Sequence, residues 1–194
     1  EEIADFAALN STSSLQIKEL APDIRTLTKS TKRKLCGEID MRIGVDGTWY
    51  YKASPIGRKE LVKLFSSVLR RDDNGDFWLI TPAEMARIRV DDAPFIVKEL
   101  TATGNNETQL ITFRTNVDTK VLLSEEHPLF VFVNPVSNEP RPYITIKPRL
   151  DALILRSVFY QLVEIGTMLT IDGNDVWGVW SNGNFFPISA ADSI

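Results

Sequence analysis

Alternation of apolar and polar residues is the feature that most constrains how this chain can fold. From Glu38 onward, Ile39, Met41 and Ile43 stand at every second position, the period of a strand with one buried face. The pair Asp46-Gly47 follows and predicts a hairpin turn, because both residue types tolerate positive φ. Further strands are expected at 76–80, 86–90, 95–103, 108–115, 129–133 and 142–147, with two short aromatic strands near the end.

Two segments break this alternation and carry the helical period. Residues 61–69 place apolar side chains on one broad face, and Ser54-Pro55 upstream is typical of a helix start. A long helix is expected to open at Pro148 and to end near Gly166. Strands mixed with two helices predict an α+β fold, whose C-terminal half is an antiparallel sheet with one long helix.

Composition removes several classes of protein. With 43% hydrophobic and 25% charged residues, the chain is neither disordered nor fibrous, and its apolar runs are too short to cross a membrane. The 22 basic and 26 acidic residues give a net charge of −4, which argues against nucleic acid as a partner. The acidic first residues and the single cysteine favour the cytoplasm over export.

The chain is expected to have three parts. Residues 1–36 form an N-terminal extension with a polar stretch and a basic cluster at 29–34. Residues 37–92 form a first α+β domain, and residues 93–194 form a second, larger one. The basic cluster is more often a solvated linker than a phosphate site.

An internal repeat relates the two halves at an offset of 98, the distance from Arg58 to Arg156. The same offset matches Leu64 with Leu162 and Gly75 with Gly173, without a gap. Each copy is a strand, a helix, an Asx-Gly turn and an aromatic strand. We therefore expect an internal duplication, although any two amphipathic helices can be matched to some degree.

Catalytic and cofactor motifs are absent from the sequence. No glycine-rich phosphate loop occurs, and the lone Cys36 and His127 are not expected to form a catalytic dyad. Adjacent carboxylates such as Asp91-Asp92 point to opposite faces of a strand. No catalytic residue, metal site or cofactor is expected, and an enzyme is the third choice among the functions considered.

Basic residues in donor-rich segments indicate a site for a small anion. Arg58 and Lys59 stand near the start of a predicted helix, where free backbone N–H groups favour anions. For any single arginine, pairing with an acid is the more common outcome. The candidate ligand-binding residues are Arg58, Lys59, Arg114, Asn116, Arg141, Tyr143 and Trp180.

Several of these segments resemble a bacterial family catalogued as domain of unknown function 1285. The resemblance covers about residues 36–188 and does not extend to residues 1–34. It rests on Ile39-Asp40-Met41-Arg42-Ile43, Asp46-Gly47-Thr48-Trp49-Tyr50-Tyr51, Ser54-Pro55-Ile56-Gly57-Arg58-Lys59-Glu60-Leu61-Val62, Asp92-Ala93-Pro94-Phe95, Phe113-Arg114-Thr115-Asn116-Val117-Asp118, Pro140-Arg141-Pro142-Tyr143, Gly178-Val179-Trp180-Ser181 and Phe185-Phe186-Pro187.

The resemblance implies a duplicated α+β core whose C-terminal half is similar to pleckstrin-homology domains. It also implies a nucleotide-like ligand between the halves and a part in signal transduction. The resulting hypothesis is a non-catalytic ligand-binding or sensory module that binds a small anion in a cleft between its two halves. The alternative is a protein-interaction adaptor that uses its aromatic strands and the cleft. Converging arginines favour the first function, and exposed flat aromatic surface favours the second.

Overall fold

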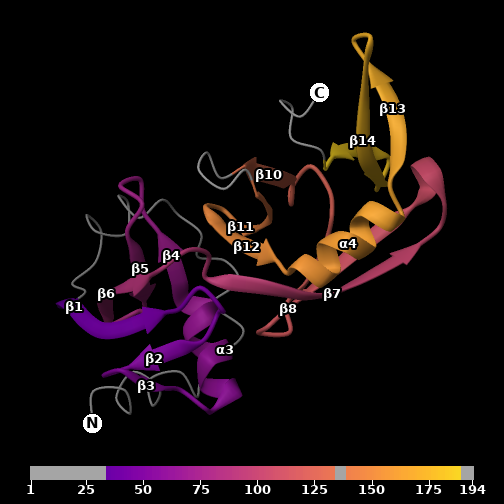
Figure 1. The fold of residues 1–194 in the computed structure, drawn as a ribbon. Helices are drawn as coiled ribbons and strands as arrows, with labels where there is room; N and C mark the ends of the chain where they lie inside the picture. Colours follow the sequence, from indigo (N-terminus) through magenta and orange to yellow (C-terminus); the bar gives the residue numbers. More distant parts are fainter. Residues whose placement is uncertain (1–33, 134–138, 189–194) are drawn as a thin grey trace. The chain divides into compact units, whose positions relative to one another are not determined.

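Two compact units make up the described part of the chain, drawn in colour in Figure 1. The computed structural model describes residues 34–133 and 139–188. Within these ranges, unit 1 holds residues 34–44 and 48–91, and unit 2 holds residues 45–47 and 92–188. The extension expected at residues 1–36 lies outside the described residues except for 34–36, which belong to the first strand.

Unit 1 is a six-stranded sheet with one α-helix. The sheet order is β3-β2-β1-β6-β5-β4, and β1 runs parallel to β6 while the other neighbours are antiparallel. Its elements are β1 (Lys34–Ile43), β2 (Trp49–Tyr51), β3 (Ser54–Pro55), α3 (Lys59–Val68), β4 (Leu69–Arg71), β5 (Phe77–Ile80) and β6 (Glu84–Val90).

The core of unit 1 forms where α3 meets the sheet. Phe65 of α3 stacks on Trp49 of β2 with ring centroids 6.1 Å apart, and both side chains are buried. The predicted turn at Asp46-Gly47 is present, with Gly47 at φ 77°. The predicted helix start at Ser54-Pro55 is wrong. These residues form β3 at the sheet edge, where proline is tolerated, and α3 begins after Arg58.

Unit 2 contains two sheets and the second α-helix. The larger sheet has the order β10-β11-β12-β7-β8-β9, and the smaller has the order β13-β14-β15. Its elements are β7 (Phe95–Thr103), η2 (Asn106–Thr108), β8 (Leu110–Thr115), β9 (Lys120–Leu122), β10 (Leu129–Val133), β11 (Pro140–Lys147), β12 (Leu150–Ile154), α4 (Arg156–Glu164), β13 (Thr167–Ile171), β14 (Asn174–Ser181) and β15 (Asn184–Pro187).

Two expectations for the C-terminal half need correction. The larger sheet is not wholly antiparallel, because β12 pairs with β7 in parallel. The helix does not open at Pro148, since 150–154 form β12 and α4 starts at Arg156 with nine residues. Burial alternates along β12, and Arg149 has a positive φ of 63°, which interrupts any helix there.

The two faces of the larger sheet carry different side chains. The inner face carries buried side chains such as Phe95, Phe113 and Ile144, and α4 packs beside β7 with Val158 and Leu162 buried. The cross-strand row Phe130–Tyr143–Leu153–Ile96 belongs to the opposite, outer face, which is exposed at Phe130 and fully buried at Ile96. Side chains alternate along each strand, so Arg141 and Phe132, two positions from Tyr143 and Phe130, share this outer face.

The fold is therefore α+β, mostly sheet, with one α-helix in each unit among the described residues. No helix in the described ranges combines the length and apolar character needed to cross a membrane.

The two aligned leucines of the helices should differ in their importance for stability. Leu162 is fully buried, whereas Leu64 is only half-buried. Leu162→Ala should lower the free energy of unfolding by about 2–5 kcal/mol, because it leaves a cavity in the core. Leu64→Ala should cost less than that. Urea unfolding measures both, and equal losses would contradict the burial seen here.

Candidate functional site

Asp92 is the centre of a polar cluster on the outer face of unit 2. Its Oδ2 accepts a hydrogen bond from Arg141 Nη2 at 2.5 Å, and its Oδ1 accepts one from the Tyr143 hydroxyl at 3.0 Å. The Asp92 side chain is 17% exposed and that of Arg141 is 37% exposed. With both carboxylate oxygens engaged, Asp92 holds the guanidinium and the phenol in fixed orientations.

Aromatic rings surround this cluster. Phe130 stacks on Tyr143 with ring centroids 5.5 Å apart, and the Arg141 guanidinium lies 5.9 Å from the centre of the Tyr143 ring. Phe132 is paired in register with Arg141 and is 54% exposed. Burial, and then the hydrogen bond to Asp92, raise the pKa of Tyr143 to about 12, so its hydroxyl stays protonated at neutral pH.

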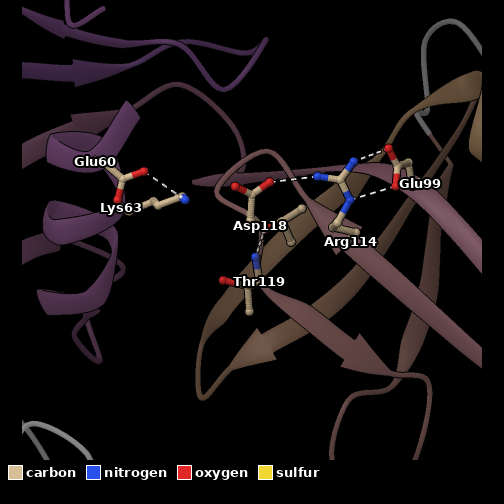
Figure 2. A network of polar contacts seen from close by, with 7 residues as sticks. Glu60, Lys63, Glu99, Arg114, Asp118 and Thr119 are labelled. Carbon is tan, nitrogen blue, oxygen red and sulfur yellow. Dashed lines mark hydrogen bonds and ion pairs between the residues drawn. The ribbon is translucent and has the colours of Figure 1, made fainter. Parts of the chain in front are cut away.

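Arg114 is held by two carboxylates, as Figure 2 shows. Its Nε donates to Glu99 Oε2 at 2.7 Å, its Nη2 donates to Glu99 Oε1, and its Nη1 donates to Asp118 Oδ1 at 2.7 Å. The hydrogen bond from Arg114 is the main reason that the pKa of Glu99 lies below its usual value. All three guanidinium nitrogens of Arg114 are therefore engaged within unit 2.

Asn116 and Trp180 have structural contacts in unit 2. Asn116 Oδ1 accepts from the Ile96 backbone N–H at 3.1 Å, and its Nδ2 donates to the Gly47 carbonyl at 3.2 Å. Trp180 packs edge-on against Phe185, with ring centroids 5.5 Å apart. Among the described residues, no hydrogen bond or ring contact joins either side chain to Arg141.

Arg58 and Lys59 lie in unit 1, at the start of α3. Arg58 is the N-cap residue, and its carbonyl accepts from the backbone N–H groups of Leu61 and Val62. Its side chain caps nothing. Lys59 is the first residue of the helix. The structure thus brings Arg141 and Tyr143 together and holds Arg114 and Asn116 in separate contacts of unit 2.

The residues that complete the cluster were missed in the sequence. The sequence pattern marks Asp92 as one of two adjacent acids and as part of a family motif, without a role. In the structure the pair divides its contacts: Asp91 binds Arg42 in unit 1 at 2.7 Å, and Asp92 binds Arg141 in unit 2. For the two exposed phenylalanines of β10, the sequence predicts a strand and no further role. The strand is apolar at all five positions, so only the structure shows that Phe130 and Phe132 are its exposed residues.

The single histidine and the single cysteine lie in different units, and the described ranges hold no cluster that fits a metal ion. His127 Nδ1 lies 3.0 Å from the carbonyl of Thr145, and Cys36 is a half-buried residue of β1 in unit 1. No cluster of three or more His, Cys, Asp or Glu that fits a metal ion is found in residues 34–133 and 139–188.

Comparison with known proteins identifies the family. Residues 30–93 match the family described as "Domain of unknown function (DUF1285), N-terminal domain", and residues 94–188 match "Protein of unknown function (DUF1285), C-terminal domain". The chain belongs to the DUF1285 family. The two matches meet between residues 93 and 94, close to the change of unit after Asp91.

Two solved structures share this fold. A DUF1285 family protein from Silicibacter pomeroyi DSS-3 is 40% identical with a TM-score of 0.74, over 82% of this chain and 85% of that one. A second, from Shewanella baltica OS155, is 22% identical with a TM-score of 0.53, over 65% of this chain and 91% of that one, and shows the fold alone. A search of curated proteins finds no match.

The Glu99–Arg114 pair should weaken as the pH falls. Because Arg114 lowers the pKa of Glu99, the ion pair is complete above the ordinary glutamate pKa of about 4.3 and is lost as the pH falls through the lowered value. Arg114→Ala should return the Glu99 pKa toward about 4.3, as measured by NMR titration of its carboxyl. Arg141→Ala serves as the control and should leave it unchanged; an unmoved Glu99 in Arg114→Ala would refute the pairing.

Asp92 should likewise control the ionisation of Tyr143. Asp92→Asn removes the negative charge beside the phenol, so the Tyr143 pKa should fall from about 12. It should stay above the ordinary value of about 10, because burial persists. NMR titration of the labelled tyrosine ring measures the change. Asp91→Asn is the matched control, and an equal effect of both variants would contradict the geometry.

Proposed function

We propose that this protein is a non-catalytic ligand-binding module of signal transduction, and that its ligand is a small, nucleotide-like anion bound at Arg141. The absence of a catalytic motif in the sequence supports the non-catalytic part. Two expectations stay predictions: that the ligand lies between the two halves, and that the protein is cytoplasmic.

The single observation that carries this proposal is the hydrogen bonding of Arg141. Asp92 accepts from one guanidinium nitrogen only, and no other acceptor for Arg141 is found among the described residues. A guanidinium has five N–H donors in a planar fork that suits phosphate and carboxylate. Asp92 fixes the fork, and the remaining donors are left for a ligand. Arg114 offers no such edge, since its three nitrogens already have acceptors.

The neighbouring rings favour a ligand that is planar as well as anionic. Phe130 is 43% exposed and Phe132 is 54% exposed, on the same outer face as Arg141. Stacking of a base on an aromatic side chain contributes about 1–3 kcal/mol. A ligand with a ring and an anionic group can therefore contact a phenylalanine and Arg141 together.

The exposed phenylalanines also favour a second function, the protein-interaction adaptor. Exposed aromatic side chains beside an arginine are typical of the centre of protein interfaces. In this alternative, Phe130, Phe132 and Arg141 contact a protein partner, and the Asp92–Arg141 pair gives specificity rather than binding a free anion.

We also propose that the two halves arose by duplication. In support, α3 is followed by β4, a turn at Gly75 and β5, and α4 is followed by β13, a turn at Gly173 and β14. Both glycines have positive φ, 88° and 82°. The hairpins end in different sheets, one of six strands and one of three. A pleckstrin-like arrangement is supported by α4 packing beside β7 of the sheet that precedes it and is opposed by the parallel β7–β12 pair.

Ligand binding is tested by calorimetric titration of the full chain with adenosine monophosphate and, separately, with inorganic phosphate. Adenosine monophosphate should bind more tightly than phosphate, because only the nucleotide also supplies a ring. Arg141→Ala should weaken its binding at least about tenfold, since it removes the charged partner. Phe132→Ala should weaken the nucleotide and leave phosphate unchanged if Phe132 is the stacking ring.

Arg114→Ala is the matched control, because it removes an acid-paired arginine from the same unit. It should bind both probes as the unmodified chain does. Equal weakening by Arg114→Ala and Arg141→Ala would overturn the assignment to Arg141. An unmodified chain that binds neither probe would overturn the anion site and leave the adaptor function.

A further inference from the structure

Edge strands are where the sheets of this protein can accept another strand, and most of them are protected. An unpaired edge invites association, and proteins blunt it with short strands, charges or proline. Here β3 has two residues with Pro55, β4 carries two arginines, β9 has three residues with Lys120, and β15 contains Pro187. The edge strand β10 is uncharged, but it lies beside β15.

β13 has none of these protections. Its sequence Thr-Met-Leu-Thr-Ile contains no charge, no proline and no glycine, and it pairs with β14 over five consecutive residues without a bulge. Among the described residues it is one of the two outer strands of the three-stranded sheet. By the rules that natural sheets follow, such an edge is an association site.

The hairpin that contains β13 extends away from the core of unit 2, beyond the end of α4 (Figure 1). Its base is anchored, because Trp177 Nε1 donates to the Val163 carbonyl of α4 at 3.3 Å. Met168, which pairs with Trp177 at this base, is 53% exposed, and Ile171, at the distal end beside the turn, is 38% exposed. A two-stranded hairpin is marginally stable alone in water, so this distal part has much to gain from a further strand.

We propose that β13 pairs antiparallel with β13 of a second copy of this chain. Full overlap of the five residues places Leu169 opposite its own copy, Met168 opposite Thr170, and Thr167 opposite Ile171. The two three-stranded sheets then join into one continuous six-stranded sheet. The contact is isologous, as in the common two-fold dimer, and it needs no second protein.

Charge favours β13 over the rest of the surface as the place where a second copy pairs. The chain has a net charge of −4, so most contacts between copies bring like charges together. β13 is an exception, because its five residues are uncharged. The acids of the hairpin are Asp172, in the turn that follows Ile171, and Asp175 on β14, whose Oδ1 accepts a hydrogen bond from the Thr170 hydroxyl of β13 at 2.7 Å. The edge offers no charge that would select a charged foreign peptide over its own copy.

The oligomeric state is measured by light scattering and sedimentation of the full chain over a range of concentrations. The unmodified chain should show a concentration-dependent dimer. Leu169→Lys should raise the dimer dissociation constant at least about tenfold, since it sets like charges directly opposite each other at the two-fold axis. Val176→Lys is the matched control, because Val176 pairs with Leu169 from β14 and lies one strand away from the edge.

Cross-linking tests the register without relying on stability. In a Cys36→Ser background, Leu169→Cys should form an intermolecular disulfide, because residues directly opposite in antiparallel strands have Cα atoms about 4.5–5.5 Å apart, within the range of a disulfide. Val176→Cys should not cross-link. A chain that is monomeric at every concentration, a Leu169→Lys variant that dimerises as the unmodified chain does, or equal cross-linking by both cysteines would overturn the proposal.

Discussion

Burial of one face of the larger sheet in unit 2 is the constraint on which the candidate site depends. Once Phe95, Phe113 and Ile144 are packed on the inner side, the pleat of each strand sends the alternate residues outward. This alternation places Arg141, Tyr143, Phe130 and Phe132 on the outer face. A slip of one residue in β11 would bury a guanidinium without a partner, which is far more costly than losing one contact.

On the outer face, the arginines of this acidic chain are paired with carboxylates. Glu99 and Asp118 surround Arg114, and Asp92 holds Arg141. The two arginines differ in the guanidinium donors that remain available. Every nitrogen of Arg114 has an acceptor, whereas Arg141 is oriented through one nitrogen. An arginine held by one carboxylate is preorganised for a second anion, because little side-chain freedom is left to lose on binding. This difference separates a structural arginine from a candidate ligand-binding one.

The edge strands also differ from one another, in whether they carry residues that prevent pairing with a further strand. Proline, lysine or arginine occurs on most of the other edge strands, and β13 in the outlying hairpin lacks all of them. The proposed duplication makes the contrast sharper. In unit 1 the hairpin after the helix is completed by β6 and β1 within one sheet, whereas the corresponding hairpin in unit 2 belongs to a sheet of three strands.

Much of the local structure was readable from the sequence, because it depends on short-range rules. Period-two alternation predicted β1 and most later strands, the turn at Asp46-Gly47 followed from its residue types, and the resemblance to the DUF1285 family is confirmed. Local signals failed where two periods overlap. At 150–155 the apolar residues fit a helix as well as a strand, and only pairing with β7 and β11 decides for β12.

The sequence by itself determined that the chain is α+β, carries two helices in its described part, and has arginines in donor-rich segments. Only the tertiary structure decided which acid meets which arginine. Asp92 and Arg141 are 49 residues apart, and Glu99 and Arg114 are 15 apart, so each contact exists only after the strands have paired. Because these two contacts depend on distances across the sheet rather than along the chain, no pattern of neighbouring residues specifies them, whereas the Arg114–Asp118 contact spans only four residues and is local.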